Sequence, residues 1–85
     1  MESKLAVNAL SALAHEGRLA VYRLLVQAGL EGLPAGEIAR ALDVPPNTMS
    51  THLAILSRAG LATSERHSRL IVYKADIESL RALMV

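Results

Sequence analysis

The sequence predicts a mainly α-helical fold that carries one β-hairpin, with its elements in the order ααααββα. Apolar residues recur at helical spacing across residues 3–42 and 47–59, which is typical of amphipathic helices. Residues 61–75 instead form short runs rich in β-branched and aromatic residues, as strands do. The length of 85 residues fits one domain, residues 1–85, rather than two.

A surplus of apolar residues distinguishes the composition. Hydrophobic residues make up 52% of the chain, yet it has no Phe or Trp, so the core must be built from Leu, Ile, Val, Ala and Met. A domain of this size buries only roughly 60% of its unfolded surface. We therefore expect a second copy of the chain to cover part of the apolar surface, in a homodimer.

Several classes of protein are excluded by what the chain lacks. No apolar run reaches the roughly 18 residues of a membrane span, and the N-terminus has no signal-peptide pattern, so we expect a cytoplasmic protein. The absence of Cys excludes disulfides and thiolate metal sites. The sequence has no Cys nucleophile, no Gly-rich phosphate loop and no pair of carboxylates of the kind that would indicate an enzyme.

The first two helices are predicted over residues 3–14 and 16–28. The first has a narrow polar stripe and a wide apolar face, which suits contact with its own core and with a second subunit. The alternative is a helix buried entirely in its own domain. The second helix has apolar residues on most sides, as a central core helix does, and Gly29 marks its end.

A tight turn between two short helices is predicted next. Residues 34–42 form the third helix and residues 47–59 the fourth. Between them, Asp43 tolerates the left-handed conformation that ends helices. Pro45 and Pro46 stop the third helix and direct the chain into the fourth. This arrangement is a helix-turn-helix.

A hairpin and a last helix complete the chain. Residues 61–65 and 69–75 are predicted strands, and the polar residues 66–68 form the tip between them. No Asn-Gly pair or single Gly marks the turn, so the register of the hairpin is not determined. Asp76 is the expected N-cap of a final helix, which reaches residue 85.

Positive charge is concentrated in the segment that holds the fourth helix and the hairpin. Residues 45–75 carry four Lys or Arg against one Glu, whereas residues 1–44 and 76–85 each carry one more acidic than basic residue. A local basic segment in a nearly neutral chain indicates a surface that faces a polyanion. The alternative is a chance imbalance on a solvated face.

The outward face of the fourth helix is small and polar. A helix that enters the major groove of DNA needs such a face, since its backbone must come close to the base edges. A basic hairpin beside it can reach the phosphate backbone or the adjacent minor groove. The residues that we expect to contact DNA are Asn47, Ser50, Thr51, Arg58, Arg66, His67 and Arg69. A winged-helix module that binds a protein partner is the alternative, and it would need an apolar or acidic face.

Four stretches resemble transcriptional regulators of the ArsR type. Residues 10–19, LSALAHEGRL, are similar to their opening LKALADPTRL, and residues 37–44, EIARALDV, are similar to their helix ELAxxLGL. Residues 48–61, TMSTHLAILSRAGL, are similar to TVSHHLKVLRxAGL, and residues 69–73 are similar to the wing strand GRWVYY. The resemblance implies a winged helix-turn-helix homodimer that pairs through its first and last helices. It also implies a repressor that binds a palindromic operator and is released by a signal.

The resemblance assigns roles to particular residues. Pro46 and His52 join Asn47, Ser50 and Thr51 at positions that face DNA or lie close to it. Among the apolar residues of the first and last helices, contacts between the two subunits are expected at Leu5, Ala9, Leu80 and Met84. Many relatives have Gln-Ser where this chain has Pro46-Asn47, so the operator sequence is not predicted.

Metal sensing is the family property from which this sequence departs. The Cys-Val-Cys site of arsenic and cadmium sensors corresponds to Pro34-Ala35-Gly36, and the Asp-x-His pattern of zinc sensors reads Asp76-Ile77-Glu78. The three histidines are too scattered in sequence to suggest one site. We expect no metal or cofactor in residues 1–85, and we expect the signal, arsenite or another metalloid, to be sensed outside them.

Overall fold

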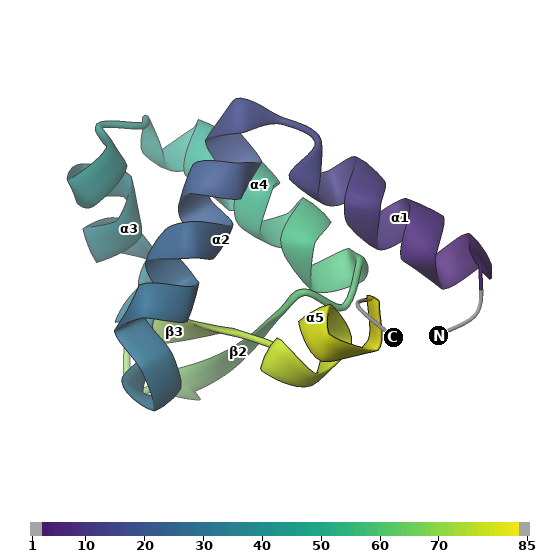
Figure 1. Cartoon of the computed structure of the whole chain (residues 1–85). Coiled ribbons are helices and arrows are strands. Elements are labelled where there is room, and N and C mark those ends of the chain that lie inside the picture. Colours follow the sequence, from purple (N-terminus) through teal and green to yellow (C-terminus); the bar gives the residue numbers. More distant parts are fainter. Residues whose placement is uncertain (1–2, 84–85) are drawn as a thin grey trace.

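A computed structural model describes residues 3–83 of the chain (Figure 1). The helices are α1 (Ser3–Leu13), α2 (Glu16–Ala28), α3 (Ala35–Leu42), α4 (Pro46–Arg58) and α5 (Ile77–Leu83), with a 3-10 turn η1 (Gly29–Glu31) after α2. The strands are β1 (Leu33–Pro34), β2 (Ala62–His67) and β3 (Leu70–Ala75). The predicted order ααααββα is confirmed, with the short strand β1 as an addition. No helix within residues 3–83 is long and apolar enough to cross a membrane.

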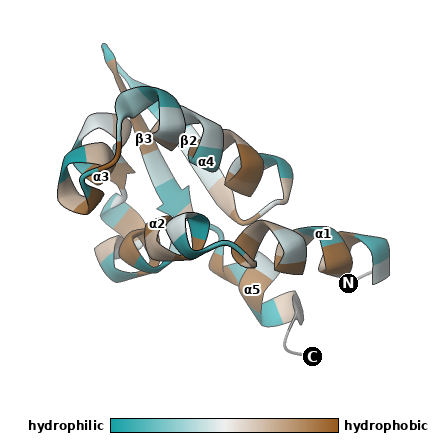
Figure 2. Ribbon diagram, turned by 90° about the horizontal axis from the view of Figure 1, so that it is seen from above, coloured by the Kyte–Doolittle hydropathy of each residue, from teal (hydrophilic) through white to brown (hydrophobic). Residues whose placement is uncertain are grey.

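The helix α2 lies at the centre of the molecule. It packs against α1, α3, α4 and β3, and in Figure 1 it passes in front of α4. The helix α3 lies at one end of the molecule, while α1 and α5 lie at the other. The hairpin of β2 and β3 projects from the helical body and has a hydrophilic tip (Figure 2). We call this hairpin, residues 62–75, the wing.

The core is mainly aliphatic, as the composition predicts, but it also contains the buried ring of Tyr22. Its largest fully buried side chains are Val21, Leu25, Ile38, Met49, Leu53, Leu56 and Leu61. Full burial of one such side chain contributes roughly 1.5–3 kcal/mol, so this set supplies the main favourable term of folding. Three of its members belong to α4 at spacings of four and three residues, so one side of α4 is inside the core and the opposite side faces outward.

The helix α1 has apolar residues on two sides. Ala9 and Ala12 are buried against the core. Leu5, Val7 and Leu10 are each more than half exposed. The wide apolar face expected from the sequence is therefore divided between the core and an uncovered surface.

The residues expected at the contact between two subunits differ in how exposed they are in the single chain. Leu5 is exposed, but Ala9 is fully buried in its own chain. The expectation that Ala9 contacts a partner is therefore wrong, because the core already covers it. Leu80 is half-buried and packs against the core, and Met84 lies outside the described residues.

The wing has an antiparallel register that the sequence alone left undetermined. His67 pairs with Leu70, so the turn consists of Ser68 and Arg69 alone, and β2 extends further than predicted. Ser68 has a φ of 61°, the positive value that the first turn residue of a type II′ hairpin requires. Because Ser stands where Gly is usual, the sequence carries no recognisable turn signal.

A third strand, β1, joins the sheet beside β3. Leu33 pairs with Tyr73 and Pro34 with Val72, which gives the strand order β1-β3-β2. Pro34 was expected inside the third helix, but it has an extended backbone and precedes α3. Gly32 makes this close approach feasible: its φ is 67° and its ψ is −169°, and a Cβ there would collide with the backbone carbonyl oxygen of Tyr73.

Replacing Gly32 by Ala should destabilise the fold more than replacing Gly29 by Ala. Both glycines have a positive φ with an extended ψ, a combination that costs other residues about 1–3 kcal/mol. A Cβ at Gly29 meets no atom within 4 Å, whereas one at Gly32 collides with β3. Urea unfolding midpoints of both variants measure the difference, and equal losses would contradict the role assigned to the β1–β3 contact.

Candidate nucleic-acid interface

The turn between α3 and α4 sets the direction of α4. Asp43 ends α3 in the left-handed conformation that the sequence predicts, with φ 52° and ψ 50°. Pro45 has an extended backbone, and Pro46 opens α4, where its missing N–H has no helical partner to lose. Residues 46–48, which open α4, are exposed, and the first large apolar residue of the helix, Met49, is buried.

The outward face of α4 is a stripe of mostly small side chains. Its exposed residues are Pro46, Asn47, Ser50, Thr51 and Arg58, and Ala54 is half-buried. Asn47, Thr51, Ala54 and Arg58 follow one another at spacings of four, three and four residues, so they lie on one side of the helix. None is large and apolar, and the backbone of α4 can therefore approach another surface closely.

The side chain of Thr51 has a defined hydrogen-bond role. Its hydroxyl donates to the backbone carbonyl oxygen of Asn47, at 3.2 Å, one turn earlier in the helix. The hydroxyl proton is thus used within α4, while the oxygen remains able to accept a hydrogen bond. Thr51 therefore offers an acceptor and a methyl group to whatever contacts this face.

The wing has uncompensated positive charge near its tip. Arg66 and Arg69 are exposed, and neither forms an ion pair within the described residues. Lys74 differs, because its ammonium donates to Glu65 at 2.9 Å; this hydrogen bond lowers the pKa of Glu65. The Nε2 of His67 lies 3.3 Å from the same carboxylate. The two arginines consequently supply the free charge of the wing.

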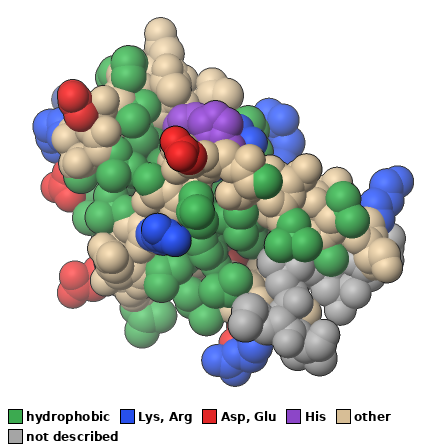
Figure 3. All heavy atoms as spheres, turned by 45° about the horizontal axis from the view of Figure 1, so that its top comes forward, with side chains coloured by type: hydrophobic (Ala, Val, Ile, Leu, Met, Phe, Trp, Pro, Cys, Tyr) green, Lys and Arg blue, Asp and Glu red, His purple; other side chains and the backbone are tan. Residues whose placement is uncertain are grey.

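His52 does not belong to the outward face, so its expected position facing DNA is wrong. It is only 8% exposed, and its ring lies 5.2 Å, centroid to centroid, from that of His15. Residue 52 lies on the flank of α4 that packs against the turn between α1 and α2. Burial lowers the pKa of His52, and the nearby His15 and Arg18 lower it further. Figure 3 shows the histidine atoms beside Lys or Arg atoms on this side of the molecule.

His15 begins α2 by acting as its N-cap. Its Nδ1 accepts hydrogen bonds from the backbone N–H groups of Gly17, at 3.0 Å, and Arg18, at 3.4 Å. The structure thus brings together His15 and His52, which are too far apart in the sequence to suggest one site, while His67 lies on the wing. Within residues 3–83, no group of three or more His, Cys, Asp or Glu side chains could hold a metal ion.

Comparison with known sequences identifies related proteins. A family described as a helix-turn-helix domain matches residues 13–65. The HTH-type transcriptional regulator YgaV of Escherichia coli (strain K12) is 32% identical over 75 residues, which cover 88% of this chain and 74% of that protein. The transcriptional activator HlyU of Vibrio cholerae is 29% identical over 79 residues, which cover 93% of this chain and 70% of HlyU.

Comparison with solved structures finds the same architecture. An ArsR-like transcriptional regulator from Rhodococcus sp. RHA1 has a TM-score of 0.84 and 26% identity, over 95% of this chain and 74% of that one. The homodimeric winged helix-turn-helix DNA-binding domain of Mb0332 from Mycobacterium bovis has a TM-score of 0.83 and 26% identity, over 95% of this chain and 73% of that domain. In both structures, most of the fold described above has an equivalent.

Stability should fall as the pH is lowered through about 6.5, and His52 should account for part of the loss. The unfolded chain binds a proton at His52 near pH 6.5, whereas the folded chain, with its lowered pKa, binds it only at lower pH. Stability from this group is therefore complete above about pH 6.5 and is lost as the pH falls toward the folded-state pKa. Urea unfolding between about pH 7.5 and 5 should show a weaker pH dependence in His52→Gln than in His67→Gln, an exposed-histidine control. The same dependence in both variants would contradict this assignment.

Proposed function

The chain belongs to the ArsR family of winged helix-turn-helix transcriptional regulators, and from that premise we propose that it is a dimeric repressor of a palindromic operator. The observation that carries this proposal is the exposed stripe of α4. In a helix-turn-helix, the N-terminal part of the second helix approaches the base edges of the major groove. Asn47, Ser50 and Thr51 occupy this part of α4, and they are exposed.

Thr51 and Asn47 are the base readers in this proposal. The Asn47 amide can donate and accept together, which suits the edge of adenine. The Thr51 oxygen accepts from a base amino group, and its methyl group suits the methyl of thymine. The intrahelical bond from Thr51 to the Asn47 carbonyl supports this role, because it holds the hydroxyl in one orientation.

The wing supplies affinity that does not depend on sequence. Arg66 and Arg69 contact phosphates, since their charges are free, while Lys74 is engaged with Glu65. Each phosphate contact releases counterions and so adds to the salt dependence of binding. His67 belongs to the same contact region, and its Nε2 lies 3.3 Å from the Glu65 carboxylate.

Pairing of two chains is supported by the uncovered apolar side of α1. Leu5, Val7 and Leu10 are exposed there, at the end of the molecule opposite α3 (Figure 1). The helix α5 lies at the same end, and Leu80 is only partly covered. Burial of this surface in a symmetrical pair would relate the two α4 helices by a two-fold axis, as the two half-sites of a palindromic operator are related.

In this proposal the dimer represses transcription by occupying the operator, because a bound dimer excludes other proteins from that stretch of DNA. The relative HlyU is described as an activator, so the direction of regulation is a matter for a reporter measurement. Release depends on a signal, and the family resemblance points to arsenite or another metalloid. We place its sensing outside residues 1–85.

Replacing Thr51 or Asn47 by Ala should reduce the preference for the operator while leaving weak binding to random DNA nearly intact. Each direct base contact discriminates by about 1–3 kcal/mol, so the ratio of specific to random affinity should fall at least about fivefold. Thr63→Ala provides a matched control, because Thr63 is exposed in β2 and lies outside α4. Fluorescence anisotropy with both duplexes measures the ratio. An unchanged ratio in a normally folded dimer would remove α4 as the reader and favour a protein partner instead.

Replacing Leu10 by Glu should weaken the dimer, because the charge would be placed in the apolar surface between subunits. Leu30→Glu is the matched control, since Leu30 is 93% exposed in η1 and lies away from α1. Sedimentation equilibrium at several concentrations should show a larger monomer fraction for Leu10→Glu than for Leu30→Glu. If both variants remain as dimeric as the unmodified chain, α1 does not pair the subunits.

A further inference from the structure

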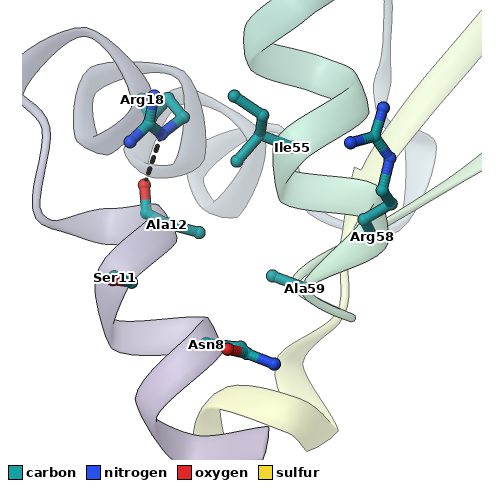
Figure 4. A pocket seen from close by; sticks show the side chains of 7 residues that line it. All are labelled: Asn8, Ser11, Ala12, Arg18, Ile55, Arg58 and Ala59. Carbon is teal, nitrogen blue, oxygen red and sulfur yellow. Dashed lines mark hydrogen bonds between the residues drawn. The ribbon is translucent and has the colours of Figure 1, made fainter.

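A cleft lies between α1 and the C-terminal turns of α4. Its volume is about 310 Å³, and it is open to solvent. It is lined by Asn8, Ser11 and Ala12 of α1, Arg18 of α2, and Ile55, Arg58 and Ala59 at the end of α4 (Figure 4). Two arginines from elements that are far apart in the sequence therefore line one cleft.

Arg18 is held in place by the turn between α1 and α2. Its Nε donates to the backbone carbonyl oxygen of Ala12 at 2.7 Å, and the side chain is partly buried. No carboxylate of residues 3–83 lies within ion-pair distance of Arg18 or Arg58. The charge of Arg18 also reaches His52, whose pKa it helps to lower. Among the described residues, the positive charge of the cleft is therefore not compensated by an ion pair.

The cleft continues the outward face of α4. Arg58 is the last member of the stripe that begins at Asn47, and it lines the cleft with its neighbours Ile55 and Ala59. These neighbours lie on the flank of α4 that faces α1. A helix seated in the major groove has the sugar-phosphate backbone along its flanks, so the cleft lies where a backbone strand would pass.

The polar groups of the cleft are suited to an oxyanion. Two guanidinium groups can donate to phosphate oxygens, the Asn8 amide offers two more N–H groups, and the Ser11 hydroxyl offers one O–H. Arginine is the preferred side chain for phosphate because its planar set of donors matches the oxygen geometry. We propose that this cleft binds a phosphodiester group of the DNA backbone, next to the groove that α4 enters. This inference rests on the proposed function, since it extends the same DNA interface from α4 to α1.

The substitution Asn8→Asp tests the cleft without altering the core, because Asn8 is exposed. Its carboxylate would offset the positive charge of the two arginines and repel a phosphate. Binding to specific and random duplexes should weaken together by about tenfold, and the salt slope should fall by about 0.9 for each phosphate that the cleft no longer neutralises, with two clefts in a dimer. Gln27→Glu introduces the same charge on the exposed side of α2 and should leave the slope nearly unchanged. Arg58→Gln should reduce the slope as Asn8→Asp does, and the double variant should show little further reduction.

The other results each exclude the proposal in a distinguishable way. If the unmodified chain binds duplex DNA but Asn8→Asp keeps its salt slope, the cleft is not a phosphate site and the proposed function stands. If the unmodified chain binds no duplex, both fail. If Asn8→Asp changes only the sedimentation behaviour, the cleft serves a second copy of the chain. If inorganic phosphate, titrated without DNA at constant ionic strength, saturates the unmodified chain and not Asn8→Asp while duplex binding is equal, the cleft binds a free oxyanion instead.

Discussion

The arrangement of the DNA-facing surface depends on the burial of one side of α4 against the core. Met49, Leu53 and Leu56 are each at most 1% exposed, and α2, α3 and β2 all pack against α4. Side chains of a helix are fixed relative to one another, so burying these three determines which others face outward. The stripe from Asn47 to Arg58 is the direct consequence. A core without Phe or Trp does this through many aliphatic contacts, each of them small and together sufficient.

Much of the fold could be predicted because each main element has a local signal. Helical spacing identifies the helices, and the run of Asp43, Pro45 and Pro46 identifies the turn between α3 and α4. The features that escaped prediction depend on contacts between distant segments. The strand β1 is defined by its pairing with β3. It has only two residues, one of which is Pro34, so the sequence shows no strand pattern there. The turn of the wing has Ser68 at a positive φ, a conformation that a Ser residue does not predict.

The candidate site divides in the same way. Exposure along α4 follows from periodicity alone, so Asn47, Ser50 and Thr51 could be identified without a structure. His52 was assigned by resemblance to a family and Ala9 by the apolar face of the first helix, and neither signal specifies what packs on the residue. The turn between α1 and α2 covers His52, and the core covers Ala9. The cleft was not foreseen because it joins Arg18 and Arg58, which only the packing of α1 beside α4 brings together.

Arg18 connects three parts of the molecule that the proposed function requires to move as one. Its side chain bonds to the end of α1, its backbone N–H is capped by His15 at the start of α2, and its charge acts on His52 in α4. The outer side of α1 pairs the subunits in our proposal, and α4 reads the DNA. A symmetrical dimer can occupy two successive major grooves, about 34 Å apart, only if the spacing of its two α4 helices is defined. In our proposal, that spacing depends on a fixed arrangement of α1 and α4 within each subunit. The hydrogen bonds of Arg18 contribute to this arrangement, because they connect the end of α1 to the start of α2.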